Sequence, residues 1–221
     1  MNLLLPTEGY YVQSVPVDLT KPLILKRHYA HRMPSITYAF GLFNNGALAG
    51  VCTFGSPANR NLCVGICGPE YKSYVIELNR LVLEDNIPNE ASRLIGASLK
   101  LLPGNWIVVS YADTAQGHKG VIYQATNWKF TGTTKERQEF NPQGKHSRHY
   151  SASDPHRIRS AKHRYVTFVG NKRWKRKAYE ALNYPESPYH AGGEKVNEHA
   201  IRVQKDDGRQ KLHRQSRRCF T

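Results

Sequence analysis

The sequence predicts an α/β fold in which a central sheet is flanked by helices. Strand-like and helix-like hydrophobic periods alternate along the first 170 residues, which is typical of this class. Hydrophobic residues make up 39% of the 221 residues, enough to build a packed core. The Asn-Asn-Gly turn signal at 44–46 separates two runs rich in β-forming residues, so these two runs are predicted to form a hairpin.

The predicted elements follow one another without an internal repeat. They are a strand at 10–15, a helix from about 18 to 28, hairpin strands at 36–42 and 47–54, a strand at 74–83, a helix at 89–102, a strand at 106–111, a short helix at 119–127, and strands at 128–133 and 165–169. Asp18 or Thr20 caps the first helix, and Pro22 falls where a missing N–H is harmless. Residues 55–72 are rich in Gly, Pro, Asn and Cys without a sustained period, so we expect an irregular insertion there.

The middle of the chain brings polar side chains to the predicted strands. Residues 74–83 alternate apolar and polar side chains, and Glu77, Asn79 and Arg80 are expected to emerge near one another on this strand. Asn89 is a plausible cap for the following helix. Residues 106–111 are continuously apolar, as in a strand covered on both faces, and Asp113 lies just beyond it.

Charge is distributed unevenly along the chain. The formal net charge is +15, of which residues 1–128 contribute +2 and residues 129–221 contribute +13. Lys and Arg release counterions when they neutralise phosphates, so such a one-sided charge favours a polyanion as the partner. Double-stranded DNA is therefore the expected partner, whereas an anionic membrane is disfavoured because the basic stretches lack a broad apolar face.

Residues 145–177 carry 11 Lys and Arg against one acid, Asp154. Cations at this density predict positioning contacts with phosphates, which carry no base information. The alternative is a solvated basic face that binds nothing. The predicted DNA contacts are Arg157, Arg159, Lys162, Arg164, Lys172, Arg173, Lys175, Arg176 and Lys177.

We expect a soluble protein that is not secreted. The sequence has no run of about 18 apolar residues, and its start has neither a basic leader nor a long apolar core. Its four cysteines, Cys52, Cys63, Cys67 and Cys219, form no CxxC pair, so reduced and partly buried thiols are expected in preference to a zinc site.

The order of elements resembles the N-acetyltransferase (GNAT) superfamily over about residues 10–170. The resemblance implies a mixed, mostly antiparallel sheet in which acetyl-coenzyme A enters between two diverging strands. The segment 120–132 (GVIYQATNWKFTG) looks like the superfamily's helix-then-strand unit. We therefore expect a GNAT-like catalytic domain at 1–170 and a basic C-terminal extension at 171–221. The superfamily's phosphate loop is not cleanly present, because residues 89–92 (NEAS) occupy its place.

Three segments carry a narrower resemblance: 77–81 (ELNRL), 110–118 (SYADTAQGH) and 123–128 (YQATNW). Together they resemble the Mom family of phage DNA-modification proteins. That resemblance implies an enzyme that adds a carbamoylmethyl group to the exocyclic amine of adenine in DNA and protects phage DNA from host restriction. It also implies acetyl-coenzyme A and iron as cofactors, and a phage-encoded protein in the host cytoplasm. The oligomeric state stays open, a dimer included.

The resemblance also implies site residues. The predicted iron ligands are His28, Tyr29 and Asp113, since imidazole, phenolate and carboxylate together suit iron. The predicted catalytic residues are Asp113, Tyr123, Arg80 and Ser110, and the predicted coenzyme-binding residues are Arg80, Leu81, Asn89, Ala91, Ser92 and Tyr123. Trp128, Tyr111 or Tyr150 is expected to stack on an extruded adenine.

Each assignment has a purely structural alternative. His28 and Tyr29 could be the polar end of a helix, and Asp113 could cap the turn at 113–117. Glu77 and Arg80 could form a cross-strand ion pair, and the Ser110 hydroxyl could simply form a hydrogen bond with the backbone. Two other functions stay open: a conventional N-acetyltransferase, and a DNA-binding protein that has lost catalysis on the same scaffold.

The predicted product raises a chemical difficulty. Acetyl transfer joins an amine to the carbonyl carbon, whereas a carbamoylmethyl product joins it to the methyl-derived carbon and contains an additional amide nitrogen. Acid–base catalysis alone cannot convert acetyl-coenzyme A and adenine into that product. Either metal-supported redox chemistry or a different two-carbon donor is required.

Overall fold

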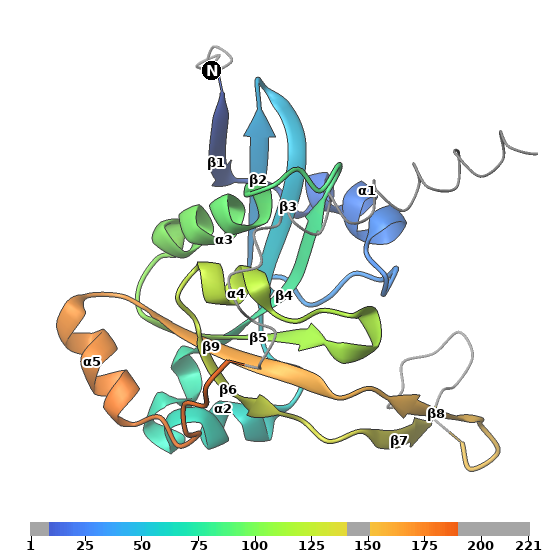
Figure 1. The fold of residues 1–221 in the computed structure, drawn as a ribbon, viewed down its shortest axis with the longest axis vertical. Coiled ribbons are helices and arrows are strands. Elements are labelled where there is room, and N and C mark those ends of the chain that lie inside the picture. Colours follow the sequence, from blue (N-terminus) through green and yellow to red (C-terminus); the bar gives the residue numbers. More distant parts are fainter. Residues whose placement is uncertain (1–8, 141–150, 190–221) are drawn as a thin grey trace, which may run out of the picture.

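A computed structural model describes residues 9–140 and 151–189 (Figure 1). Its elements in chain order are β1 (Tyr10–Ser14), α1 (Val17–Arg27), β2 (Tyr38–Asn44), β3 (Ala47–Gly55), α2 (Arg60–Cys67), the 3-10 helix η1 (Pro69–Tyr74), β4 (Val75–Leu83), α3 (Glu90–Leu101), β5 (Trp106–Asp113), the 3-10 helix η2 (Thr114–Gln116), α4 (Val121–Ala125), β6 (Lys129–Thr133), β7 (Arg137–Phe140), β8 (His156–Arg159), β9 (Lys162–Val169) and α5 (Lys172–Glu180). The elements predicted outside residues 55–72 lie within a few residues of their expected places.

Seven strands form one sheet in the order β1-β2-β3-β4-β5-β9-β6, and β7 and β8 form a separate two-stranded ribbon. Neighbouring strands are antiparallel except for β4 and β5, which are parallel. The predicted α/β class, with a mixed and mostly antiparallel sheet between helices, is therefore confirmed.

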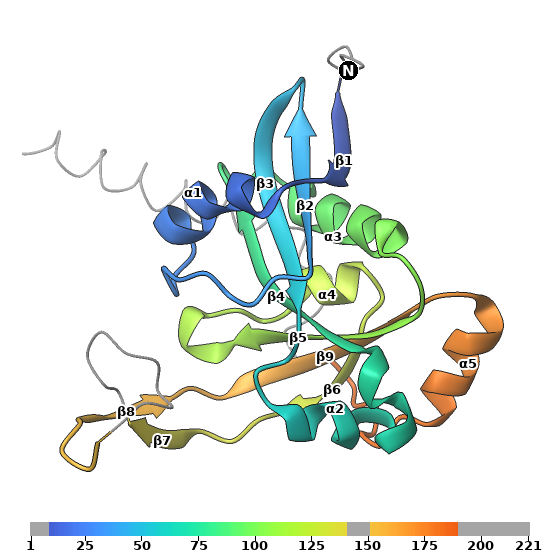
Figure 2. The same ribbon diagram turned by 180° about the vertical axis from the view of Figure 1, so that it is seen from behind.

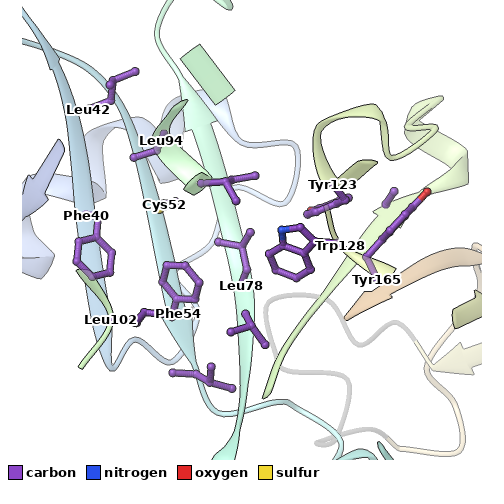
Figure 3. Close-up of a cluster of buried hydrophobic side chains, with 14 of the residues drawn as sticks. Phe40, Leu42, Cys52, Phe54, Leu78, Leu94, Leu102, Tyr123, Trp128 and Tyr165 are labelled. Atoms are coloured by element: carbon purple, nitrogen blue, oxygen red, sulfur yellow. The ribbon is translucent and has the colours of Figure 1, made fainter. Parts of the chain in front are cut away.

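Helices cover both faces of the sheet. Helices α3 and α4 lie on one face, where Phe40, Phe54, Leu94 and Trp128 belong to the largest cluster of buried side chains (Figures 1 and 3). Helices α1 and α2 lie on the opposite face (Figure 2). Two smaller clusters fill that second face, one beneath α1 and the other beneath α2 and α5. Burial of these apolar side chains on both faces is the main stabilising term of the fold.

The prediction of an irregular insertion at 55–72 is wrong, because part of this segment is helix α2. The Asn59 side chain accepts a hydrogen bond at the start of the helix, and Gly68, with a φ of 95°, ends it. Leu62 and Ile66, four residues apart, lie on one side of the helix and are buried. These cap and spacing signals are present in the sequence, but the surrounding Gly, Pro and Asn obscure them.

The C-terminal segment up to residue 189 packs on the domain. Ala178 of α5 is fully buried, and Trp174 packs edge-on against Tyr71. The Tyr189 hydroxyl donates a hydrogen bond to the Trp128 carbonyl at 2.6 Å. The predicted boundary after residue 170 stays a prediction, and residues 190–221 of the predicted extension lie outside the described residues.

Within 9–140 and 151–189, no helix has the length and apolar character needed to span a membrane. Three cysteines of this part are free thiols. Burial raises the pKa of the Cys52 and Cys67 thiols to about 12, so both stay protonated at neutral pH. Cys219 lies outside the described residues.

Candidate active site

The candidate site lies where β4 and β5 diverge. The two strands pair over only three residues, from Val75 opposite Ile107 to Glu77 opposite Val109. Beyond Glu77, β4 keeps its partner β3, whereas β5 continues beside β9. Figure 3 shows Trp128 beyond Leu78 of β4, on the side towards Tyr123. Beyond Glu77, the facing edges of β4 and β5 therefore no longer pair with each other, which is the geometry expected from the N-acetyltransferase resemblance.

A bulge in β4 brings Glu77 and Arg80 to the same face of the sheet. Thr53 pairs with Arg80 and Phe54 with Leu78, so Asn79 is the extra residue. The Asn79 amide donates to the Ser35 carbonyl at 2.8 Å and accepts from the Thr53 hydroxyl at 2.6 Å, which holds the bulge. In a regular strand, residues three positions apart point to opposite faces. The bulge therefore directs Arg80 towards α1 together with Glu77.

The Arg80 guanidinium is half-buried, and not all of its N–H groups have a hydrogen-bond acceptor. Its two terminal nitrogens donate to the backbone carbonyls of Asn79 at 2.6 Å and Arg32 at 3.2 Å. Its Nε is buried and has no hydrogen-bond partner among the described residues. Burial, followed by the nearby charge of Arg32, lowers the pKa of Arg80. A buried guanidinium N–H without an acceptor is a donor available to a carbonyl or an anion of a ligand.

Glu77 places a carboxyl group among cations. Burial is the largest influence and raises its pKa, while a hydrogen bond from the backbone of Ala58 and the charges of Arg80, Arg159 and Lys162 act in the opposite direction. A carboxyl group with a raised pKa is better matched to proton transfer near neutral pH than an ordinary surface glutamate. Glu77 is therefore the strongest candidate for a general base at this site.

His28 and Tyr29 lie next to the same cluster. The Tyr29 ring meets the His118 ring edge-on, with 6.2 Å between centroids. Burial, together with the positive charges of Arg80 and other cations, lowers the pKa of His28 to about 4, so its imidazole is neutral at neutral pH. The Ala30 N–H donates to His28 Nδ1 at 3.0 Å. The neutral ring therefore carries its proton on Nε2 and acts there as a donor.

Asp113 ends β5 and ties three segments together. Its carboxylate accepts hydrogen bonds from the backbone N–H of Ala115, the hydroxyl of Ser160 and the ammonium of Lys162. Burial alone would raise its pKa, but these hydrogen bonds hold the pKa below the ordinary value. Asp113 thus caps the following turn, as its structural alternative predicts, and also anchors the start of β9. His118, whose pKa is lowered by burial, lies close enough to respond to the Asp113 charge.

Ser110 and Tyr123 lie on the other face of the sheet, towards α4. Their hydroxyl oxygens are 2.8 Å apart, and Ser110 donates to the Leu78 carbonyl at 2.9 Å. Since the Ser110 proton is used in that bond, Tyr123 is the donor to Ser110. Burial raises the pKa of Tyr123 to about 12, so its phenol is protonated. Both residues join β4 to β5 at the divergence, and their catalytic role stays a prediction.

Three of the predicted coenzyme residues, Asn89, Ala91 and Ser92, are the sequence neighbours of Glu90, whose carboxyl group is buried. Glu90, in the first turn, is 2% exposed and accepts a hydrogen bond from the Tyr10 hydroxyl at 3.0 Å. Ala91 is buried beside it, and the Ser92 hydroxyl donates to the Asn89 carbonyl. The other oxygen of Glu90, Oε2, is buried and has no hydrogen-bond partner among the described residues. A buried carboxyl group in the first turn of α3 leaves an unfavourable place for a pyrophosphate.

A protein-family model matches most of the chain and identifies the family to which it belongs. The model named "Mom protein family" matches residues 9–189. The chain belongs to the Mom protein family. The resemblance drawn from segments 77–81, 110–118 and 123–128 is therefore confirmed. These segments contribute Glu77, Arg80, Ser110, Asp113, His118 and Tyr123 to the two faces of the divergence between β4 and β5.

One relative and several solved structures are similar to this Mom family chain. "Methylcarbamoylase mom" of Escherichia phage Mu is 33% identical over 128 residues, which are 55% of this chain and 53% of that protein. The aligned part thus spans about half the length of this relative. Among solved structures, an N-acetyltransferase from Staphylococcus aureus Mu50 is 15% identical with a TM-score of 0.45, covering 72% of this chain and 98% of that chain. A GNAT acetyltransferase from Bacillus cereus ATCC 10987 is 9% identical with a TM-score of 0.44, covering 73% of this chain and 99% of that one.

The predicted iron ligands of this Mom family chain do not fit a metal site. The Asp113 carboxylate is already occupied by three donors. A metal on His28 Nε2 would require a proton on Nδ1, yet the Ala30 N–H points at that atom. Among the described residues there is no group of three or more His, Cys, Asp or Glu side chains that could hold a metal ion. The prediction of iron on His28, Tyr29 and Asp113 is unsupported.

The nine predicted DNA contacts fall into three groups. The prediction is corrected for Lys162 and Arg164, because both bind other parts of the protein. Lys162 forms an ion pair with Asp113. Arg164 donates hydrogen bonds to Thr131, and its Cζ lies 3.6 Å from the centroid of the Tyr184 ring. The other seven are exposed. Arg157 and Arg159 lie on β8, and the remaining five, Lys172, Arg173, Lys175, Arg176 and Lys177, lie on α5.

Two site residues were missed at the sequence level, and one predicted contact is wrong. The sequence placed Glu77 beside Arg80 but gave it no catalytic role, and it gave His118 no role at all. Both residues fall inside the segments that carry the Mom resemblance, which is the signal that points to them. Trp128 is fully buried and therefore cannot stack on an extruded base. Tyr111 is only partly buried, and Tyr150 lies outside the described residues.

Proposed function

We propose that this protein transfers a carbamoylmethyl group to the exocyclic amine of adenine in double-stranded DNA, and that the modification protects phage DNA from host restriction. Membership of the Mom family and the name of the phage Mu relative support the reaction. The observation that carries the proposal is the polar cluster at the divergence of β4 and β5. There a half-buried carboxyl group, a neutral imidazole and an unsatisfied guanidinium nitrogen lie together.

In the proposed step, the amine of adenine attacks the methylene carbon of a donor that already contains its amide. The new bond joins nitrogen to carbon, the bond from that carbon to the leaving group breaks, and the leaving group takes the electron pair. Glu77 accepts the proton that the amine loses. Arg80 Nε and His28 Nε2 donate hydrogen bonds to the donor amide, which fixes its orientation.

We propose that the donor of the carbamoylmethyl group is not acetyl-coenzyme A and that it places no pyrophosphate at the start of α3. The buried carboxyl group of Glu90, in the first turn of α3, disfavours a pyrophosphate there. A donor that already carries its amide nitrogen also removes the chemical difficulty posed by acetyl-coenzyme A, and it requires no redox step. A bound coenzyme, if this chain used one, would supply an acyl thioester near Tyr123.

Double-stranded DNA is the proposed substrate because seven predicted contacts are exposed cations on two surfaces, β8 and α5. Such cations bind phosphates through a salt-dependent and sequence-independent interaction. An amine inside a duplex cannot reach a buried site without extrusion of its nucleotide, at a cost of a few kcal/mol. We therefore propose that the adenine is extruded towards Glu77. In this proposal the enzyme works in the host cytoplasm.

The test is mass spectrometry of nucleosides from cells that express the wild type, Glu77→Gln, or the control Leu101→Ala, whose side chain is 47% exposed on α3. We expect modified adenine of the carbamoylmethyl mass with the wild type and the control, and a loss of at least about a hundredfold with Glu77→Gln, which is the lower end of the range for removal of a general base. Unmodified adenine in all three samples would overturn the proposal and favour a DNA-binding protein without catalysis. Stoichiometric acetylation of an amine or protein, with none of DNA, would favour a conventional N-acetyltransferase.

A further inference from the structure

A cavity of about 440 Å³ opens at the end of the sheet where β4 begins. Strand β3 pairs with β4 from Glu77 onwards and ends at Gly55, so Val75 and Ile76 pair with β5 but lie beyond the end of β3. The loop after β3, helix α2 and η1 line the space next to them, and Figure 2 shows α2 at this end of the sheet. A volume of this size is typical of pockets that bind small organic molecules.

The cavity has an apolar floor and a cationic rim. Val75 and Ile76 are buried at the floor, and the ring of Trp106 beside them is half-buried. Arg60 of α2 and Lys72 of η1 are exposed at the rim, and neither forms an ion pair with another residue of the ranges 9–140 and 151–189. None of the described residues that line the cavity is acidic. The rim therefore favours an anion.

Three hydroxyl groups add hydrogen-bond donors to this rim. Thr37, Ser56 and Ser73 come from three different segments and are all exposed. Their hydroxyls form no side-chain hydrogen bond within the described part of the chain, so they are available to a ligand. A guanidinium, an ammonium and several hydroxyls together match the charge and the terminal oxygens of a phosphate. The floor fits the apolar body of a molecule that carries such a phosphate.

The cavity shares a wall with the candidate site. Ala58, in the loop that lines the cavity, donates a backbone hydrogen bond to Glu77. Cys63 lines the cavity from α2, and its thiol lies close enough to Glu77 and Arg60 for both charges to act on its pKa. A ligand in the cavity would therefore lie beside the proposed general base.

We propose that this cavity binds a small organic phosphate and that this molecule is the donor of the carbamoylmethyl group. The inference rests on the proposed function, and it gives a cationic place to a donor that puts no pyrophosphate at the start of α3. Arg60 and Lys72 bind the phosphate, the apolar body lies against Trp106, and the end that carries the amide extends towards Glu77. The phosphate positions the donor and takes no part in the bonds that form and break.

The test uses Cys63 as a reporter inside the cavity, since Cys52 and Cys67 are buried. Peptide mass spectrometry of the full chain measures the rate at which iodoacetamide alkylates Cys63, and the ligand concentration that halves this rate. The ligands are phenyl phosphate, inorganic phosphate, and phenol as the ring without its phosphate. We expect phenyl phosphate to protect Cys63 at about tenfold lower concentration than inorganic phosphate, because its ring is buried on the floor, and phenol to give no protection.

Arg60→Gln combined with Lys72→Gln should raise the protecting concentration of phenyl phosphate at least about tenfold, because two charged donors are lost. Both side chains are exposed, so Tm should not change. Lys100→Gln combined with Arg176→Gln removes the same charge from exposed positions on α3 and α5 and should behave like the wild type. Arg60→Lys combined with Lys72→Arg keeps both charges and should keep most of the protection. In cells, the Arg60→Gln, Lys72→Gln variant should modify adenine about tenfold less, with unchanged affinity for duplex DNA.

Equal protection in the wild type and in the Arg60→Gln, Lys72→Gln variant would overturn the cavity as a phosphate site. Protection of Cys63 by duplex DNA but not by phenyl phosphate would overturn it in favour of a DNA contact. Unchanged adenine modification in the same variant would overturn the assignment of the ligand as the donor. All three outcomes leave modification by the wild type in place, whereas its absence from wild-type cells would overturn the proposed function and the donor with it.

Discussion

Two exposed basic regions lie at opposite ends of strand β9 (Figure 1). The β7–β8 ribbon precedes β9 in the chain, and helix α5 follows it. Helix α5 exposes five cations, and its buried residue Ala178 joins it to the core beneath the sheet. The ribbon has no such core and depends on its own pairing and on Asp113 at its base. Cations of similar density in the sequence thus have different environments. Those of the ribbon border the candidate site, whereas those of α5 lie near the start of β5.

The largest expected effect comes from the residue that joins the ribbon to the site. Asp113→Ala removes the acceptor of Lys162 and Ser160, so a largely buried ammonium loses its partner. We expect the free energy of unfolding to fall by about 2–3 kcal/mol, and modified adenine to disappear. Chemical denaturation and nucleoside mass spectrometry measure the two effects. Asp113→Asn, which keeps the hydrogen-bond acceptor but not the charge, should be less destabilised; equal losses in both variants would contradict the ion-pair argument.

The second prediction separates the two basic surfaces. Neutralising Arg157 and Arg159 together, or Lys172 and Arg173 together, by substitution with Gln should lower the slope of log affinity against log salt by about 2 in each case. Only the ribbon pair should also reduce adenine modification, by about tenfold, because this pair includes Arg159, whose charge acts on Glu77. Equal losses of modification from both pairs would show that proximity to the site is irrelevant.

The third prediction concerns the pH dependence of folding stability that arises from His28. The pKa of His28 is about 4 in the folded protein and about 6.5 when unfolded, so the unfolded chain binds more protons between these values. Stability contributed by His28 is therefore present above pH 6.5 and lost as the pH falls towards 4. His28→Gln should show a smaller decrease of Tm over this window. The same slope in both proteins would remove His28 as the source.

The smallest effect is expected from Glu139, which holds the two ribbon arginines. Glu139→Gln removes the acidic partner of Arg157 and Arg159 and should raise affinity for duplex DNA about twofold, since ion pairs with half-exposed arginines are weak. Glu180→Gln on α5 is the matched control, because Glu180 lies 3.7 Å from Arg176 and is 65% exposed. Anisotropy titrations at one salt concentration compare them, and a fall in affinity with Glu139→Gln would contradict the assignment.

Local signals in the sequence determined most of the fold. Hydrophobic alternation located β4 and β5, and the Asn-Asn-Gly turn located the β2–β3 hairpin, where Asn45 and Gly46 both adopt a positive φ. Three short segments led to the Mom family, which the match over residues 9–189 confirms. These features depend on neighbours in sequence, which is why sequence alone reveals them.

Only the tertiary structure decided which polar side chains meet. The sequence predicts that Glu77 and Arg80 lie near one another, but only the structure shows the reason, which is a bulge at Asn79 that turns Arg80 to the face of Glu77. Arg164 and Lys162 belong to the same basic run as Arg157 and Arg159, yet both turn inward to Thr131 and Asp113. The side-chain environment of a charge is set by the register of strands that are far apart in the chain. The sequence therefore determines the number of cations, and the fold determines which of them are left to bind a partner.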